Sequence, residues 1–174
     1  MNGRGDETGL SDFLLWPDKR LTMIAEPVER VDDEVVAIWR RMCAAMYAMP
    51  GVGLAAPQLG IPKRLAVVDC SDGKGSAILL ANPELIQTST ETSDWDEASP
   101  NLPGVHAKVT RPAMAEVRYL DAGGAVTTRW FEGLWATSVQ HQIDHLNGKL
   151  FIDCLSRTKR RMVLDRYAKL RRRS

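Results

Sequence analysis

The chain has 174 residues, of which 44% are hydrophobic and 26% are charged, with a formal net charge of +1. These values are typical of one soluble globular domain and exclude a fibrous or low-complexity chain. The longest uncharged run, residues 42–62, contains three prolines and three glycines, so it is not a membrane-spanning helix. No basic-then-apolar leader pattern is present, and the cysteine count is three. We therefore expect a cytoplasmic protein with reduced thiols.

The charge is unevenly distributed along the chain. Residues 157–174 hold nine Lys or Arg and one Asp, whereas the rest of the chain has 14 basic and 21 acidic residues. A basic C-terminal segment on a slightly acidic body favours an anionic partner at that end alone. We expect neither DNA nor a membrane as a partner.

The predicted elements begin after a polar, Gly-rich segment. Residues 1–11 are expected to form a flexible N-terminus, and residues 12–174 a single domain. Apolar residues at helical spacing predict a helix over 32–48, with Asp32 and Asp33 at its start. Runs typical of strands follow at 64–70, 77–81, 84–92, 114–120 and 125–131. A helix is predicted over 133–146 and a basic amphipathic helix over about 157–174.

This order of elements predicts the α+β class. Strands that cluster between isolated helices favour mostly antiparallel sheets packed around the 133–146 helix, with one further helix near each end.

The central predicted helix carries the sequence QHQIDH at 140–145. His141 and His145 are four residues apart and share one helical face, so both imidazoles can reach one metal ion. In the related H-E-x-x-H pattern the intervening Glu activates a metal-bound water, but this chain has Gln142 at that position.

Two other segments are candidates for the site. GVGLAAPQ at 51–58 places small residues where a ligand could approach the backbone, and Gln58 offers an amide N–H. The segment EASPNLPG at 97–104 follows later in the chain.

In order and spacing, these three segments resemble the motifs G-x-G-[LI]-A-A-x-Q, E-G-C-L-S-x-P and Q-H-E-x-D-H of the peptide deformylase family. The segments LWPDKRLTMIAEPVERV at 15–31, NPEL at 82–85 and 148–156 resemble the flanking regions of that family. The resemblance extends over about residues 13–170. It implies the deformylase fold, with the H-x-x-x-H helix at its centre.

Members of this family remove the N-formyl group from the starting methionine of nascent proteins. By resemblance, a divalent metal (Fe²⁺ or Zn²⁺) is held by the Cys of the second motif and both histidines, and the Glu of the third motif moves the proton. The Gln of the first motif and the backbone N–H after the Cys stabilise the oxyanion. By position, the cleft would be formed by Gly51, Val52, Gly53, Leu54, Glu97, His106, Leu134 and Ser138.

The chain departs from these motifs at the reactive positions. Ser99 replaces the Cys ligand, and a neutral hydroxyl is a poor ligand compared with a thiolate. Gln142 replaces the general base, which typically contributes about 10²–10⁴ in rate. Pro100 has no N–H to donate to an oxyanion. His106 replaces an Arg that the family often carries near the peptide-binding edge, and Ser138 makes the methionine pocket more polar.

We therefore expect a protein with the deformylase fold that does not remove the formyl group efficiently and that binds no metal or holds Fe²⁺ or Zn²⁺ weakly. It would bind N-terminal peptides of nascent chains, and its basic helix could contact the ribosome. The alternative is an active metal-dependent deformylase in which a carboxylate such as Asp96 or Glu97 replaces the missing ligand. A third hypothesis makes Ser99 a nucleophile activated by His141 or His145 and oriented by Asp144.

Overall fold

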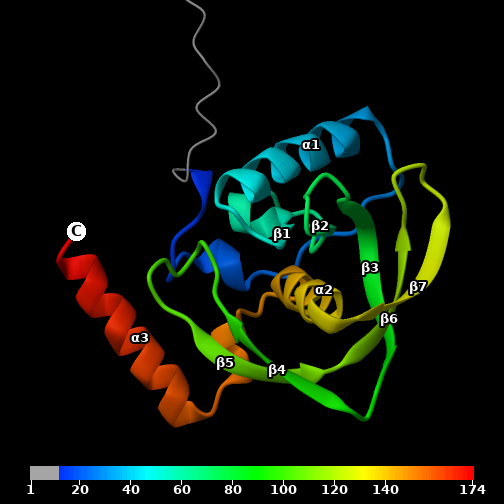
Figure 1. Ribbon diagram of the computed structural model, residues 1–174. Coiled ribbons are helices and arrows are strands. Elements are labelled where there is room, and N and C mark those ends of the chain that lie inside the picture. The colour runs from blue at the N-terminus through cyan, green and yellow to red at the C-terminus, as the bar shows by residue number, and fades with distance from the viewer. Residues whose placement is uncertain (1–11) are drawn as a thin grey trace, which may run out of the picture.

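The computed structural model describes residues 12–174, and the predicted flexible segment 1–11 lies outside the described residues (Figure 1). The helices are η2 (Lys19–Thr22), α1 (Asp33–Ala48), η3 (Ala56–Leu59), α2 (Gly133–Leu146), η4 (Phe151–Cys154) and α3 (Arg157–Arg172). The strands are β1 (Gly53–Ala55), β2 (Leu65–Val68), β3 (Ile78–Thr88), β4 (Thr92–Glu97), β5 (Ala107–Pro112), β6 (Met114–Leu120) and β7 (Val126–Glu132). The predicted α+β class is confirmed.

The strands form two sheets, and every pairing within them is antiparallel. The larger sheet has the order β1-β2-β3-β6-β7, and β4 pairs with β5 in a separate two-stranded sheet. Helix α2 contacts strands of both sheets, and Figure 1 shows it at the centre of the molecule between them. The predicted arrangement of sheets around a central helix is therefore confirmed.

Helix α1 covers the β1–β2 part of the large sheet. The side chain of Asp32 accepts a hydrogen bond from Val35 N at 2.9 Å, which caps the helix as the sequence predicts. After this cap, the helix carries an apolar stripe that is buried against the sheet and consists of Val35, Trp39, Met42 and Met46. This apolar stripe is core.

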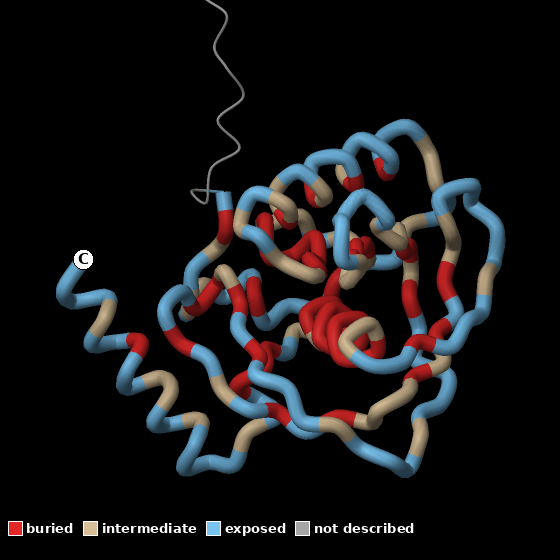
Figure 2. The backbone as a smooth tube through the Cα atoms, in the orientation of Figure 1, coloured by how far each residue is buried: buried red, intermediate tan, exposed pale blue. Residues whose placement is uncertain are grey.

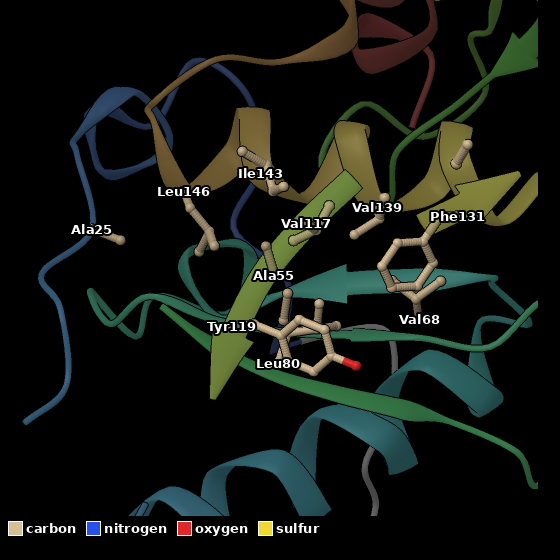
Figure 3. Close-up of a cluster of buried hydrophobic side chains, with 12 residues drawn as sticks. Ala25, Ala55, Val68, Leu80, Val117, Tyr119, Phe131, Val139, Ile143 and Leu146 are labelled. Carbon is tan, nitrogen blue, oxygen red and sulfur yellow. The ribbon is translucent and has the colours of Figure 1, made fainter. Parts of the chain in front are cut away.

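Helix α2 is buried around most of its circumference. Ten of its 14 residues are buried, which Figure 2 shows as a red coil in the middle of the molecule. One face carries Val139, Ile143 and Leu146, which pack on Leu80, Val117 and other apolar residues of the large sheet (Figure 3). The opposite face is polar. A helix with this much buried polar surface needs hydrogen-bond partners or a ligand.

The strand predictions need three corrections. The predicted strands 77–81 and 84–92 are one strand, β3, which ends at Thr88. The strand passes through Asn82 in a left-handed conformation (φ 50°), and its register against β6 shifts between Ala81 and Glu84. The Asn82 side chain accepts from Val28 N and donates to Val28 O, both at 2.8 Å, which stabilises this conformation. Strands β4 and β5 and the short strand β1 were not predicted, because their sequences lack clear apolar alternation.

The C-terminal helix α3 lies on the outside of the molecule (Figures 1 and 2). It begins after Ser156, whose side chain accepts from Lys159 N, and it ends two residues before the predicted limit. Tyr167 is its one buried residue, and Val163, Leu164 and Leu170 pack beside it against a cluster that includes Leu102 and Val105. Within residues 12–174, no helix combines the length and the apolar character that crossing a membrane requires.

Candidate functional site

Three segments meet around a cavity of about 430 Å³. The first comprises residues 49–53 and Gln58, the second residues 95–100 and Pro103, and the third one face of α2. On α2 the lining residues are Leu134, Thr137, Ser138, His141 and Gln142, whose spacing of three, four, seven and eight residues defines a single helical face. The segments that the sequence singled out are therefore brought together by the fold.

Most of the predicted site residues line this cavity. They are Gly51, Val52, Gly53, Gln58, Glu97, Ser99, Pro100, Leu134, Ser138, His141 and Gln142. The structure places the other three elsewhere. Leu54 is fully buried in the core under α1, His106 is exposed and is not part of the cavity lining, and His145 is buried next to His141.

The two histidines face each other through their Nε2 atoms, which lie 3.2 Å apart. His141 Nδ1 is 2.7 Å from Glu97 Oε1. Hydrogen bonds from His141 and Arg111 outweigh the effect of burial and lower the pKa of Glu97 to about 2. Because Glu97 is therefore ionised, Nδ1 of His141 donates its proton to this carboxylate, and Nε2 of His141 is the nitrogen that faces His145.

His145 is more deeply buried than His141. Burial, together with the nearby His141 and Arg111, lowers its pKa well below the usual value, so the ring is neutral. Its Nδ1 has no hydrogen-bond partner among residues 12–174. The two Nε2 atoms converge on one point, and two nitrogen ligands of a tetrahedral zinc ion lie about 3.3 Å apart.

Arg111 fixes the outer side of this histidine pair. It donates to both oxygens of Glu97 at 2.7 and 2.9 Å, and to Asp144 Oδ2 at 2.8 Å. These contacts join β5 to the end of β4 and to α2. The pKa of Arg111 is raised by the two carboxylates, although its burial acts in the opposite direction. Sequence reasoning did not find Arg111, because β5 itself carried no recognisable pattern.

Ser99 is held by amides rather than by imidazoles. Its hydroxyl is 3.0 Å from Asn101 Oδ1 and 3.3 Å from Gln58 Nε2. Gln58 also donates to Asn101 Oδ1 at 2.8 Å and accepts from Ala55 N at 2.9 Å, so its amide is fixed at both ends. Ser99 makes no hydrogen bond with His141 or His145, so the nucleophile hypothesis lacks the base that it requires.

Gln142 lies at one edge of the α2 face that lines the cavity. Its Oε1 is buried and has no partner among the described residues. A Cβ atom added at Gly53 would lie 2.5 Å from both Gln142 Nε2 and Ser138 Oγ. A larger residue at this position would therefore require the Gln142 amide and the Ser138 hydroxyl to move. Ser138 donates to Val52 O at 3.0 Å, which ties α2 to the segment before β1.

The donor set does not match a metal ion with three protein ligands. Within residues 12–174, no three His, Cys, Asp or Glu side chains are grouped in a way that could hold a metal. The histidines supply two convergent nitrogens, but the hydroxyl of Ser99 bonds Asn101 and Gln58 instead. The carboxylate of Glu97 already accepts hydrogen bonds from Arg111 and lies against Nδ1 of His141.

An α+β fold with two convergent imidazoles on its central helix is a scaffold for a histidine-based metal site, here without a third His, Cys, Asp or Glu ligand among residues 12–174. The family model described as polypeptide deformylase matches residues 10–161 of this chain. The chain belongs to the peptide deformylase family.

Individual relatives agree with this assignment over nearly the whole chain. A peptide deformylase of Rhizorhabdus wittichii is 47% identical over 163 residues, covering 90% of this chain and 92% of the relative. One from Afipia carboxidovorans is 42% identical and covers 92% and 95%. The crystal structure of a peptide deformylase from Legionella pneumophila superposes with a TM-score of 0.85 at 39% identity, covering 92% and 94%. The family and fold predicted from the three motifs are confirmed.

Proposed function

We propose that this chain keeps the peptide-binding cleft of a deformylase but does not remove the formyl group efficiently. The observation that carries the proposal is the position of Ser99, whose hydroxyl bonds Asn101 and Gln58 instead of joining the histidines. Gln142 cannot accept a proton from water, and Pro100 has no N–H for an oxyanion. Each of these changes removes a different part of the hydrolytic reaction.

The cleft itself retains a surface for an extended peptide. Strand β1 lies at the edge of the large sheet. Val52 O accepts from Asp69 N on the β2 side, whereas Ala55 N donates to Gln58 on the other side. Because backbone groups alternate in direction along an antiparallel strand, Gly53 directs its N–H and C=O toward the open side. A peptide N-terminus can pair with this edge by strand addition.

Metal content and formate release test the proposal directly. We would measure bound metal by elemental analysis and formate release from a formyl-Met peptide with added Fe²⁺, Ni²⁺ or Zn²⁺. The matched variant carries Ser99→Cys and Gln142→Glu together. We expect little metal and little formate from the unaltered protein, and stoichiometric metal in the double variant. Because Pro100 remains in that variant, regained metal is the decisive reading.

The opposite result has an equally clear meaning. Stoichiometric metal and clear turnover in the unaltered protein would overturn the proposal and establish an active deformylase. Two observations favour this second function: the Nε2 atoms of His141 and His145 converge, and relatives at 40–47% identity are named peptide deformylase. Asp96, which lines the cavity, is then the acid to replace first by Asn.

Peptide binding without cleavage is measured separately. An N-formylated tripeptide and the same peptide with a free amine are titrated calorimetrically against the unaltered protein. We expect the formylated peptide to bind more tightly, because Gln58 and Ser99 offer neutral hydrogen-bonding groups and Glu97 is already paired with Arg111. Equal affinities for the two peptides would contradict the proposed recognition of the formyl group.

We also propose that α3 docks on ribosomal RNA, which would place the protein at nascent chains in the cytoplasm. Its apolar face is used against the body through Tyr167 and Leu170, which leaves most of its basic side chains exposed. Co-sedimentation with ribosomes at increasing salt tests this idea. We expect pelleting that falls with salt and is lost when residues 157–174 are deleted, and unchanged pelleting of the truncated chain would contradict it.

A further inference from the structure

The side-chain amide of Gln58 has no free hydrogen. Its Oε1 accepts from Ala55 N at 2.9 Å, which places Nε2 on the opposite side of the amide. This Nε2 donates to Asn101 Oδ1 at 2.8 Å and to Ser99 Oγ at 3.3 Å. An amide nitrogen carries two hydrogens, so both are engaged within the protein. Gln58 therefore has no N–H left for a ligand, although the motif resemblance assigns it to oxyanion stabilisation.

The orientation of the Asn101 amide is fixed by its own donors. Asn101 is fully buried, and its Nδ2 donates to Leu14 O at 2.5 Å and to Gln58 O at 3.2 Å. Both partners are carbonyl oxygens, so Nδ2 must face them and Oδ1 must face Gln58 and Ser99. The bond from Gln58 Nε2 satisfies Asn101 Oδ1 whether or not Ser99 also donates to it.

Ser99 has the one hydrogen of this cluster that a ligand can use. Its Oγ accepts from Gln58 Nε2 at 3.3 Å and from Asn101 N at 3.4 Å, so both of its lone pairs are engaged. Its hydrogen faces Asn101 Oδ1 at 3.0 Å. A hydroxyl hydrogen rotates about the Cβ–Oγ bond, and turning it toward a ligand leaves no donor or acceptor of the cluster unpaired. Toward a ligand, Ser99 is therefore a donor only.

The Ser99 hydroxyl lies at the wall of the cavity. Ser99 and Gln58 both line the cavity, whereas the other residues of η3 do not. Because the carbonyl oxygen of Gln58 accepts from Leu14 N, we assign its contact with the cavity to its side chain. Ser99 Oγ lies 3.3 Å from the end of that side chain. The next residue, Pro100, lines the cavity too but has no N–H to donate.

We propose that the Ser99 hydroxyl donates to the oxygen of the formyl group when an N-formylated peptide occupies the cavity. It takes the place of Gln58, whose hydrogens are engaged, and of the N–H that Pro100 lacks. The inference rests on the proposed function, because it names the group that recognises a formylated N-terminus. A free ammonium terminus has no acceptor for this hydrogen, so the contact favours the formylated peptide.

A single-atom change in the ligand tests this contact on the unaltered protein. An N-formyl-Met tripeptide and its N-thioformyl analogue differ only in the oxygen or sulfur atom, and sulfur is the weaker hydrogen-bond acceptor. Their affinities for the full chain are measured by isothermal titration calorimetry. We expect the formyl peptide to bind about fivefold more tightly, which is the effect of one neutral hydrogen bond.

Three variants locate the donor through the ratio of the two affinities. Ser99→Ala removes the hydrogen and should bring the ratio near one, whereas Ser99→Thr keeps a hydroxyl and should preserve the ratio. Ser138→Ala is the matched control, because Ser138 lines the same cavity but donates to Val52 O at 3.0 Å. Its ratio should equal that of the unaltered protein, even where both affinities fall. A purely structural role of Ser99 would weaken both peptides equally and leave the ratio unchanged.

The possible failures are distinguishable. Equal affinities of the unaltered protein for the two peptides would overturn the role of Ser99 while leaving peptide binding intact, and this reading does not depend on the folding of any variant. A ratio that survives Ser99→Ala would assign the donor to another group and overturn the inference. Failure of both peptides to bind would overturn this inference and the proposed function together.

Discussion

At the scale of single residues, one buried arginine holds the histidine face of the cavity in place. Arg111 is 6% exposed and contacts two carboxylates, one at the end of β4 and one on α2. The charges compensate each other only while all of them are present. Removing the arginine leaves Glu97 buried with an uncompensated charge, which is a costly arrangement in a protein interior.

Arg111→Met should therefore lower the free energy of unfolding by about 3–5 kcal/mol. The matched control is Arg118→Met, because Arg118 pairs with Glu84 at the same N···O distance of 2.7 Å but both side chains are more than half exposed. An exposed pair contributes about 0–1 kcal/mol, so the control should be nearly neutral. Urea unfolding monitored by tryptophan fluorescence compares the two, and equal losses would contradict the role assigned to Arg111.

A second buried carboxylate organises the loop at residues 69–76. Asp69 is fully buried and accepts from Gly75 N and Ser76 N at 3.0 and 3.1 Å, and from Tyr47 Oη at 2.6 Å. Although burial acts to raise its pKa, these bonds and those from Ser71 lower it below the usual value. Burial and the bond to Asp69 raise the pKa of Tyr47 to about 12.

This depressed pKa predicts how stability depends on pH. Asp69 binds its proton more weakly in the folded chain than in the unfolded chain, where its pKa is about 3.9. Its contribution is therefore complete above about pH 4 and is lost as the pH falls below that value. Asp69→Asn should reduce the fall in unfolding free energy between pH 5 and pH 3, measured by urea titration. The exposed neighbour Asp72, changed to Asn, should leave that slope unchanged.

At the scale of elements, the helices were predictable because each carries its own pattern. The stripe of Val35, Trp39, Met42 and Met46 and the cap at Asp32 are local signals, and the structure confirms the helix that they predict. Strand β4 has the sequence TSDWDE, in which neither face is apolar, and it is stabilised by pairing with β5. Pairing between distant segments leaves no local trace, so this part of the site was missed.

The sequence located only those site residues that lie within the three motif-like segments. His141, Gln142, Gln58 and Ser99 were located by position within the three segments, and they do meet at one cavity. The contacts that hold them in place were not predicted. Arg111 lies on the unpredicted strand β5, and the part of Asn101 in fixing Gln58 and Ser99 depends on the fold of the turn after β4.

The junction of β1 with α2 gives a prediction at this scale. Gly53→Ala would place a Cβ atom 2.5 Å from Gln142 Nε2 and Ser138 Oγ, so the two elements must separate or their side chains must move. We expect a loss of about 1–3 kcal/mol in unfolding free energy, together with weaker binding of the formylated peptide.

Gly73→Ala is the matched control for this substitution. A Cβ atom at Gly73 meets nothing within 4 Å, so the change should be neutral or slightly stabilising. Thermal unfolding and peptide titration of both variants provide the comparison. If Gly53→Ala behaved like Gly73→Ala in both measurements, the close contact between β1 and α2 would contribute neither to stability nor to peptide binding.

At the scale of the whole molecule, charge and cavity are separated. The basic residues of α3 lie on the outside of the molecule, whereas the cavity is formed by β1, the end of β4 and α2 (Figure 1). Helix α3 is attached to the body mainly through the apolar cluster around Tyr167. The Tyr167 hydroxyl also donates a hydrogen bond to Trp16 O at 3.2 Å. If α3 binds an anionic partner, this separation predicts that a peptide can occupy the cavity at the same time.

The separation also predicts that the two binding events respond differently to salt. If α3 contacts RNA phosphates, changing Arg171, Arg172 and Arg173 to Ser should reduce the slope of log affinity against log salt by about 2 to 3, because each neutralised phosphate contributes about 0.7 to 0.9. Fluorescence polarisation of a labelled RNA hairpin across a salt series measures this slope. Thr137→Val, which alters the cavity alone, should leave the slope unchanged, and the triple variant should leave peptide affinity unchanged. Loss of peptide binding in the triple variant would instead show that the helix and the cleft are coupled through the body.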